Sequence, residues 1–270
     1  MKIIFTLLLC SCGFIVNAQI DIKLFSENNN NVITLYASNN EYCPVSILLD
    51  LHLTNMVFTQ GKIKTLVIPE KTAKYKLGEL SIATPGEKYK YSYSSHYNFG
   101  DITINNYDTS YEYDLPYSKG KRFLLFQGYN GSFSHQNENA LDFTMPEGTE
   151  ILAARDGIVI KIVDNNSESC PQQECSKYNN YVMVYHSDGT FANYVHIRFG
   201  GSKVKPGDQI KKGELIALSG NTGWSSGPHL HFSCSLPGIT KRETIMTKFK
   251  INNGSTAEYL IEKGIYLKDY

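Results

Sequence analysis

Hydrophobic and polar residues alternate with a period of two over much of the chain. Between residues 45 and 53 every second residue is Val, Ile or Leu, and polar residues such as Ser46, Asp50 and His52 fall between them. Residues 88–93 alternate Tyr with Lys and Ser, and shorter runs fall at 32–36 and 64–68. Because successive side chains of a strand point to opposite faces, each run predicts a strand. Pro and Gly separate the runs, so we expect a β-sandwich-like domain over residues 20–117.

A second strand-rich segment follows a predicted linker at residues 117–120. Its apolar runs fall at 158–163, 181–186, 191–196, 216–219 and 229–233, with Gly and Pro between them. These runs predict further β-sheet over residues 121–270. The fold class expected for the whole chain is therefore all-β, with two domains.

The first residues predict a leader. Lys2 precedes an almost wholly apolar run from Ile3 to Val16, and Val16-Asn17-Ala18 supplies small residues where a signal peptidase cuts. The run is shorter than the roughly 20 residues that span a bilayer. We expect a signal peptide at residues 1–18, cleavage after Ala18, and a secreted or periplasmic protein. An uncleaved anchor, or a lipoprotein acylated at Cys12, are the alternatives.

Charge and cysteine content narrow the class of protein. The 270 residues carry 26 Lys and Arg against 26 Asp and Glu, so the chain has no basic surplus for a nucleic acid. Four cysteines follow the leader, an even number that permits disulfides in an exported protein. Cys170 and Cys175 bracket a short polar stretch and predict a local disulfide, although a cysteine zinc site is the alternative. Cys43 and Cys234 are expected to be small buried residues.

The histidines indicate a metal centre. His229 and His231 are two residues apart, so in a strand they project from the same face. His135 and Asp142 could supply two ligands, and one histidine of the pair would bring the number to three. Three protein ligands leave the fourth position of a catalytic zinc open to water. Tyr194 and His196 are expected to share a strand face. His186, His52 and His96 have no motif around them, and we interpret them as structural or solvated.

Six stretches occur in an order that resembles the M23 (LytM, lysostaphin-type) zinc metallopeptidases. They are Ser134-His135 with Asp142-Phe143, Pro146-x-Gly148-Thr149, Ala153-Ala154-x-Asp156-Gly157, Tyr194-x-His196, Gly207-Asp208-x3-Lys212-Gly213, and Gly220-Asn221-Thr222-Gly223 with Gly227-Pro228-His229-Leu230-His231-Phe232. The resemblance implies an all-β core with an active-site groove. It also implies one zinc ion per chain and endopeptidase activity on peptidoglycan peptides.

Carried over by position, the resemblance assigns zinc to His135, Asp142 and His231. It assigns His196 and His229 as the catalytic histidines that hold the water and stabilise the transition state. Six residues separate His135 from Asp142, where the family commonly has three, so we expect a longer loop, with Glu138 as the less favoured substitute for Asp142.

The sequence therefore predicts an exported, monomeric zinc metalloendopeptidase of bacterial peptidoglycan. A non-catalytic cell-wall binding or regulatory protein, and a peptidase that acts on proteins, are the alternatives. We expect no nucleic-acid partner, and no membrane span once the leader is removed.

Overall fold

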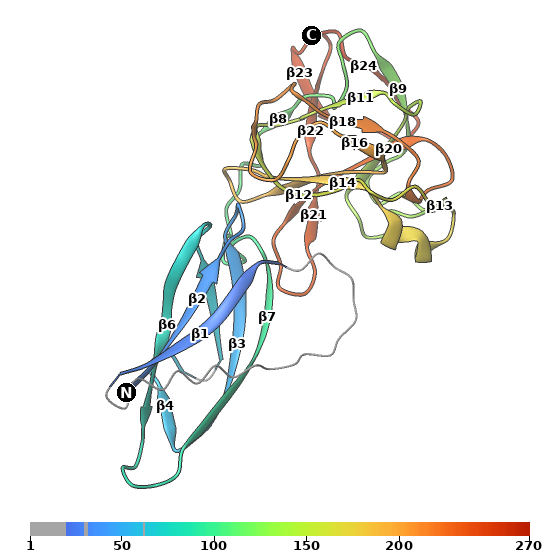
Figure 1. Ribbon diagram of the computed structural model, residues 1–270. Coiled ribbons are helices and arrows are strands. Elements are labelled where there is room, and N and C mark those ends of the chain that lie inside the picture. The colour runs from blue at the N-terminus through green and yellow to red at the C-terminus, as the bar shows by residue number, and fades with distance from the viewer. Residues whose placement is uncertain (1–19, 30–31, 62) are drawn as a thin grey trace.

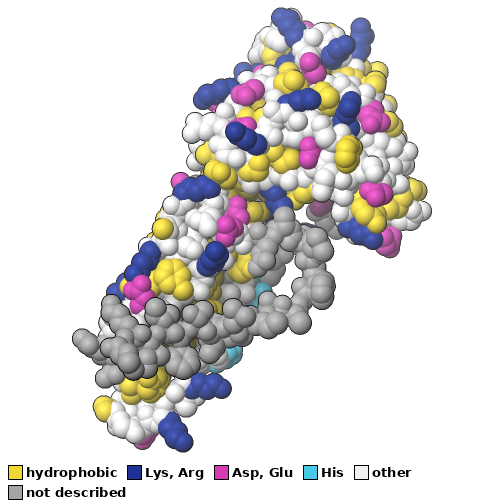
Figure 2. Space-filling view, viewed as in Figure 1, with side chains coloured by type: hydrophobic (Ala, Val, Ile, Leu, Met, Phe, Trp, Pro, Cys, Tyr) yellow, Lys and Arg dark blue, Asp and Glu magenta, His cyan; other side chains and the backbone are white. Residues whose placement is uncertain are grey.

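The computed structural model describes residues 20–29, 32–61 and 63–270, and the predicted signal peptide and Cys12 lie outside these residues. Two β-rich domains follow one another along the chain (Figure 1). Within the described residues no helix has the length and apolar character needed to cross a bilayer. On the face seen in Figure 2, basic and acidic side chains are interspersed over the upper domain, in keeping with the zero net charge.

The amino-terminal domain pairs its strands into a four-stranded sheet in the order β1-β2-β6-β4 and a three-stranded sheet in the order β5-β3-β7. The strands are β1 (Ile22–Asn29), β2 (Val32–Asn39), β3 (Val45–Thr54), β4 (Met56–Phe58), β5 (Ile63–Ile68), β6 (Thr72–Ile82) and β7 (Lys90–Phe99). In β3 the alternating Val45, Ile47, Leu49 and Leu51 are buried, as their pattern predicted. Residues of both sheets join in one hydrophobic core, which makes this domain a β-sandwich.

The carboxyl-terminal domain is built on a nine-stranded sheet in the order β17-β12-β14-β15-β20-β10-β9-β24, with β21 paired to β20. Smaller sheets have the orders β11-β18-β16, β13-β19 and β23-β22-β8. The elements are β8 (Glu112–Tyr113), β9 (Arg122–Gln127), β10 (Ala140–Thr144), β11 (Glu150–Leu152), β12 (Gly157–Val163), β13 (Ser169–Cys170), the 3-10 helix η1 (Gln173–Tyr178), β14 (Tyr181–Tyr185), β15 (Phe191–Val195), β16 (Ile197–Ser202), β17 (Gln209–Ile210), β18 (Leu215–Ser219), β19 (Gly223–Trp224), β20 (His229–Leu236), β21 (Glu243–Ile245), β22 (Lys248–Ile251), β23 (Thr256–Tyr259) and β24 (Ile265–Leu267).

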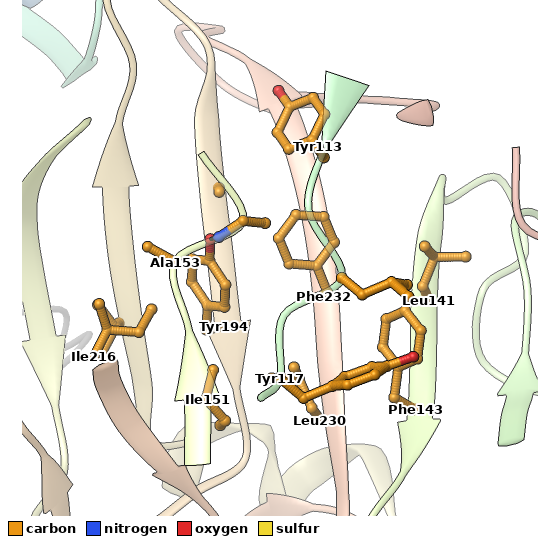
Figure 3. Packing of buried hydrophobic residues seen from close by; sticks show 14 of the residues in the cluster. Tyr113, Tyr117, Leu141, Phe143, Ile151, Ala153, Tyr194, Ile216, Leu230 and Phe232 are labelled. Carbon is orange, nitrogen blue, oxygen red and sulfur yellow. Dashed lines mark hydrogen bonds between the residues drawn. The ribbon is translucent and has the colours of Figure 1, made fainter. Parts of the chain in front are cut away.

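One face of the nine-stranded sheet is the core of this domain. Tyr194, Leu230 and Phe232 point into it from β15 and β20, and Ile151 and Ile216 meet them from the smaller sheet β11-β18-β16 (Figure 3). These side chains are almost completely buried. By alternation, the residues between them on β15 and β20 face the other way and are free to build a site.

The segment before the second domain departs from the prediction of a linker at residues 117–120. Tyr113, Leu115 and Tyr117 are at most 3% exposed and belong to the carboxyl-terminal core, and β8 pairs in parallel with β22. The hydroxyl of Tyr117 donates to the carbonyl of Tyr266 at 2.8 Å. Burial of these aromatic and aliphatic side chains therefore joins the segment to the second domain, a contact that local alternation does not reveal.

The two domains share a continuous apolar contact. Met183 and Phe191 of the nine-stranded sheet belong to the same buried cluster as Phe99 of the sandwich. Asn98 also donates through Nδ2 to the carbonyl of Gly238 at 2.7 Å. In the register of β15 and β20, Phe191 lies opposite Ser235 and Val195 lies opposite His231. Phe191 and Val195 are four residues apart and point to the same face of the sheet. The sandwich therefore packs on the sheet face that carries His231, about 13 Å along the strands from that residue.

Candidate metal centre

Two of the expected ligands lie opposite each other on neighbouring strands. β10 and β20 are antiparallel, and their register pairs Asp142 with His231 and Thr144 with His229. Leu230 and Phe232 alternate with the histidines and are buried, and each such side chain contributes about 1.5–3 kcal/mol when it is removed from water. A one-residue slip would turn these apolar side chains out of the core, so the core fixes the register that brings Asp142 to His231.

His135 reaches the same place from the loop between β9 and β10. Its side chain is 1% exposed, and its Nδ1–H donates to the carbonyl of Gly128 at 3.0 Å. The amide of Glu138 donates to the carbonyl of His135 at 2.9 Å and closes a turn directly after it. An imidazole that carries its proton on Nδ1 has its lone pair on Nε2, so Nε2 is the nitrogen available to a metal.

The three side chains converge on one point. Nε2 of His135 lies 3.2 Å from Oδ2 of Asp142 and 3.3 Å from Nδ1 of His231. Nδ1 of His231 lies 3.0 Å from Oδ1 of Asp142. One ligand atom from each residue falls within 4.8 Å of the others, which is the spacing of a metal-binding group. Two imidazole nitrogens and a carboxylate oxygen are ligands that suit zinc.

The electrostatics of the group favour an ionised carboxylate. Burial by itself would raise the pKa of Asp142, but hydrogen bonds from His135 and His231 outweigh burial and hold this pKa well below its ordinary value. Burial would lower the pKa of His135, yet the hydrogen bond and the charge of Asp142 raise it overall. A carboxylate that is already ionised is the form that coordinates a cation, and binding would displace the protons shared with the imidazoles.

His196 and His229 stand beside this group. Their ring centroids are 4.5 Å apart, and His196 is 5.9 Å from the ring of His231. His196 donates through Nδ1 to the carbonyl of Thr222 at 2.7 Å, and His229 donates through Nδ1 to that of Gly227 at 2.8 Å. Both hydrogen bonds leave Nε2 as the ring nitrogen with a free lone pair.

These two imidazoles are neutral near pH 7. Burial, together with the neighbouring rings of His229 and His231, lowers the pKa of His196 to about 3. Burial also lowers the pKa of His229, against the opposing charge of Asp142. Neutral rings with their Nε2 lone pairs free can accept hydrogen bonds or protons, which is what a general base needs.

The five residues line one groove of about 510 Å³. Phe126 and Phe133 line it on the β9 side, where Phe133 is 68% exposed. Pro171 and Trp224 line it on the side of η1 and β19. A groove of this volume, with aromatic walls and a few convergent polar groups, has the character of a binding or active site.

A disulfide stiffens the second wall. Cys170 and Cys175 are bonded, as the sequence predicted, while Cys43 and Cys234 are free and buried. β13, which contains Cys170, pairs in parallel with β19, and the indole Nε1 of Trp224 donates to the carbonyl of Pro171 at 3.0 Å. The amide of Ser225 donates to the carbonyl of Cys170 at 3.1 Å, and its Oγ lies 3.2 Å from Nδ1 of His229. The stapled loop is thus connected to His229 through Ser225.

Four of the five residues lie within a match to a known protein family. Residues 136–242 match the model of peptidase family M23, and the match contains Asp142, His196, His229 and His231. The carboxyl-terminal domain belongs to peptidase family M23. Members of this family are zinc metallopeptidases, so zinc is the metal that the donor set of the M23 domain fits.

Curated relatives match in the same region. An uncharacterized metalloprotease of Haemophilus influenzae is 39% identical over 98 residues, which are 36% of this chain and 18% of that protein. The peptidoglycan DD-endopeptidase ShyA of Vibrio cholerae is 35% identical over 102 residues, 37% of this chain and 20% of ShyA. The glycyl-glycine endopeptidase ALE-1 of Staphylococcus capitis is 32% identical over 130 residues, 48% of this chain and 29% of ALE-1. Each match spans less than a third of the relative's own length.

His196 does not lie where alternation places it. Alternation put it on the face of Tyr194, and this was wrong: β15 ends at Val195, and His196 adopts a φ of 65°, which turns it into the groove. Tyr194 instead lies in the core, where its hydroxyl accepts from the amide of Ala154 at 2.8 Å. A left-handed backbone at a residue other than Gly costs on the order of 1–3 kcal/mol, so the surrounding hydrogen bonds hold it there.

The longer loop between the first two ligands is present. Glu138 lines the groove, but the group of converging ligand atoms contains Asp142 and not Glu138. His186 is fully buried away from the groove, and His52 and His96 are exposed on the sandwich.

Sequence reasoning missed the residues that hold these side chains. Thr222 accepts from His196 through its carbonyl, and its Oγ1 donates to the carbonyl of Ile197 at 2.9 Å. Gln127 contacts Asp142 directly. Gln127 is a polar residue that directly follows the apolar run of residues 123–126, just before the loop that carries His135. This position is the sequence signal for its role.

Proposed function

We propose that this protein is a zinc metalloendopeptidase that hydrolyses peptide bonds of bacterial peptidoglycan, in stem peptides or cross-bridges. The observation that carries the proposal is the convergence of His135, Asp142 and His231 beside the Nε2 atoms of two neutral histidines, in an open groove. The M23 family match supports it. So do the names of relatives such as the peptidoglycan DD-endopeptidase and the glycyl-glycine endopeptidase.

The proposed roles of the five groove residues follow from their hydrogen bonds. His135, Asp142 and His231 hold the zinc, which when bound polarises a carbonyl and lowers the pKa of a water molecule. His196 and His229 present Nε2 to the groove. We infer that one of them accepts a proton from the attacking water at Nε2, and that the imidazolium formed in this way donates its Nε2–H to the oxygen on which negative charge develops.

The aromatic walls are assigned to substrate binding. Phe126 and Phe133 on one side, and Pro171 and Trp224 on the other, would confine an extended peptide so that its carbonyl lies over the ligand group. Holding the scissile bond in position removes much of the entropic part of the barrier.

We also propose that the protein is exported and acts as a monomer. The apolar run from Ile3 to Val16 and the Val16-Asn17-Ala18 sequence support a leader that is removed after Ala18. The Cys170–Cys175 disulfide fits a secreted or periplasmic protein, since such bonds persist in oxidising compartments. Intact-mass analysis of the protein from a cell-envelope fraction tests the cleavage, and size-exclusion chromatography with light scattering tests the monomer.

Mass spectrometry of purified muropeptides tests the activity. Cross-linked muropeptides incubated with the protein should yield products that differ by one hydrolysed peptide bond, and the His231→Ala variant should yield none. Sacculi that bind the protein without any new product would favour a binding or regulatory role. Cleavage of a denatured protein substrate while every muropeptide stays intact would favour a protein peptidase.

A further inference from the structure

The side-chain amide of Gln127 is fully engaged next to the ligand group. Nε2 of Gln127 donates to Oδ2 of Asp142 at 3.0 Å and to Oγ of Ser134 at 2.7 Å. Oε1 accepts from the amides of Phe133 and Ser134, at 3.0 Å and 2.8 Å. An amide group has two donor hydrogens and two acceptor lone pairs, so these four contacts use its whole capacity. Gln127 is 3% exposed, which makes each unmade hydrogen bond costly.

The position of Gln127 is fixed from two sides. It is the last residue of β9, and the register pairs it directly with Asp142, so the two side chains leave the sheet on the same face. The loop then folds back over it. A Cβ at Gly131 would collide with Cγ and Cδ of Gln127, so the loop passes closely only because residue 131 is glycine.

The contacts divide between the first two ligands. Asp142 is held directly, on the oxygen that also lies 3.2 Å from His135. His135 is held through Ser134, its neighbour in sequence, whose amide and hydroxyl both bind Gln127. A hydrogen bond to one carboxylate oxygen fixes the rotation of the carboxylate. The two hydrogen bonds to Ser134 fix the backbone next to His135, and so the position from which the imidazole extends.

We propose that Gln127 is the positioning residue of the metal centre, and that it compensates for the six residues between His135 and Asp142. A longer connection has more conformations in which the two ligands are apart. Gln127 bonds both the beginning of this loop, at Ser134, and the strand residue at its end, Asp142. The two ligands therefore stay close together although no short turn connects them. This inference rests on the proposed function only in taking zinc as the bound metal.

The test is zinc affinity, measured by competition with a chromogenic chelator, in Gln127→Met. Methionine keeps the length and volume of the side chain and removes all four hydrogen bonds. We expect zinc affinity to fall by about 10- to 100-fold, the usual effect of a hydrogen-bond partner behind a metal ligand. Gln136→Met is the matched control, because Gln136 lies exposed in the same loop, bonds the carbonyl of Ser132 and touches no ligand. It should bind zinc as the wild-type protein does.

A second readout separates positioning from a general structural role. Co²⁺ in place of zinc reports ligand geometry through its visible absorption, and we expect this spectrum to change in Gln127→Met. Loss of four buried hydrogen bonds would also lower the thermal stability of the protein without metal, but a residue with only that structural role would leave the Co²⁺ spectrum of the folded variant unchanged. Affinity and spectrum that match the wild-type protein would overturn the proposal.

If Gln127→Met fails to fold, Ser134→Ala decides between the outcomes, since it removes one of the two links between Gln127 and residue 134. A smaller loss of zinc affinity in a folded Ser134→Ala protein supports the proposal, and unchanged affinity refutes it. Because the readout is metal binding, absence of muropeptide cleavage by the wild-type protein would refute the peptidoglycan function and leave this result standing. A wild-type protein that binds no zinc would refute both.

Discussion

Asp142 and His231 are directly paired residues of β10 and β20, and Oδ1 of the carboxylate lies 3.0 Å from Nδ1 of the imidazole. Two residues of the proposed zinc site are therefore placed by sheet register, which the buried Leu230 and Phe232 fix from the opposite face. The third, His135, comes from a loop and depends on side-chain hydrogen bonds.

Replacement of the ligands should remove the metal. Protein purified without added metal should contain about one zinc per chain, and His135→Ala, Asp142→Ala and His231→Ala should each lose most of it, because two ligands hold zinc far more weakly than three. Elemental analysis by mass spectrometry measures the content. His96→Ala, in an exposed strand of the sandwich, is the control and should stay loaded. A fully occupied site after His231→Ala would contradict the ligand assignment.

Replacement of the other two histidines should separate binding from turnover. His196→Ala and His229→Ala keep all three ligands, so zinc content and thermal unfolding should stay close to wild type. Turnover of a muropeptide should fall by about 10²- to 10⁴-fold, the usual contribution of a group that transfers a proton.

The outcomes for the two variants have distinct meanings. Wild-type turnover in either one would remove that histidine from the mechanism. Loss of zinc in His229→Ala, together with retention in His231→Ala, would show that the roles of the two are reversed.

The sequence predicted those features of the site that depend on the local alternation of hydrophobic and polar residues. Alternation placed His229 and His231 on one face and buried Leu230, because period two holds throughout β20. The same rule failed at His196, where the backbone turns to a φ of 65°, and a single strand-ending residue leaves no signal in the alternation. Tyr113 and Tyr117 were assigned to the sandwich and its linker because their burial depends on distant strands. Local alternation gives no signal for the role of Gln127, because its hydrogen-bond partners lie in the loop at residues 133–134 and at Asp142, 15 residues away.

The disulfide should matter more for the groove than for overall stability. Cys170→Ser with Cys175→Ser removes a bridge with a sequence separation of 5, so the free energy of unfolding should fall by less than the roughly 3 kcal/mol expected for a 15-residue loop. The relative loss of muropeptide turnover should be larger than the loss of stability, because β13 pairs with β19 and holds Trp224 and Ser225 next to His229. Urea unfolding and muropeptide turnover measure the two effects.

Thiol counting checks the bridge itself. Under denaturing, non-reducing conditions, protein that begins at Gln19 should show two free thiols, Cys43 and Cys234. Cys43→Ser is the control and should lower the count to one without affecting turnover, since this residue is buried in the hydrophobic core that contains the sandwich strands and does not line the groove. Four free thiols in protein taken from an oxidising compartment would contradict the bridge.

His186 should make stability depend on pH below neutrality. Burial lowers its pKa from 6.5 to about 4, and its Nε2 has no hydrogen-bond partner among the described residues, so a proton there would be buried and unpaired. The unfolded chain binds this proton below pH 6.5, whereas the folded chain binds it only near pH 4. Stability contributed by the neutral ring is therefore complete above pH 6.5 and is lost as the pH falls towards 4, by on the order of 3 kcal/mol.

The measurement is the difference in unfolding free energy between pH 7.5 and pH 4.5, for the wild-type protein and for His186→Gln. Glutamine can still donate to the carbonyl of Asp156, which accepts from His186 at 2.7 Å, but it does not titrate. The variant should therefore lose less stability on acidification than the wild-type protein, and comparing the two cancels the contributions of the other histidines. His96→Gln, on the exposed face of the sandwich, should retain the wild-type dependence. Equal losses in His186→Gln and wild type would show that this ring does not resist protonation in the folded protein.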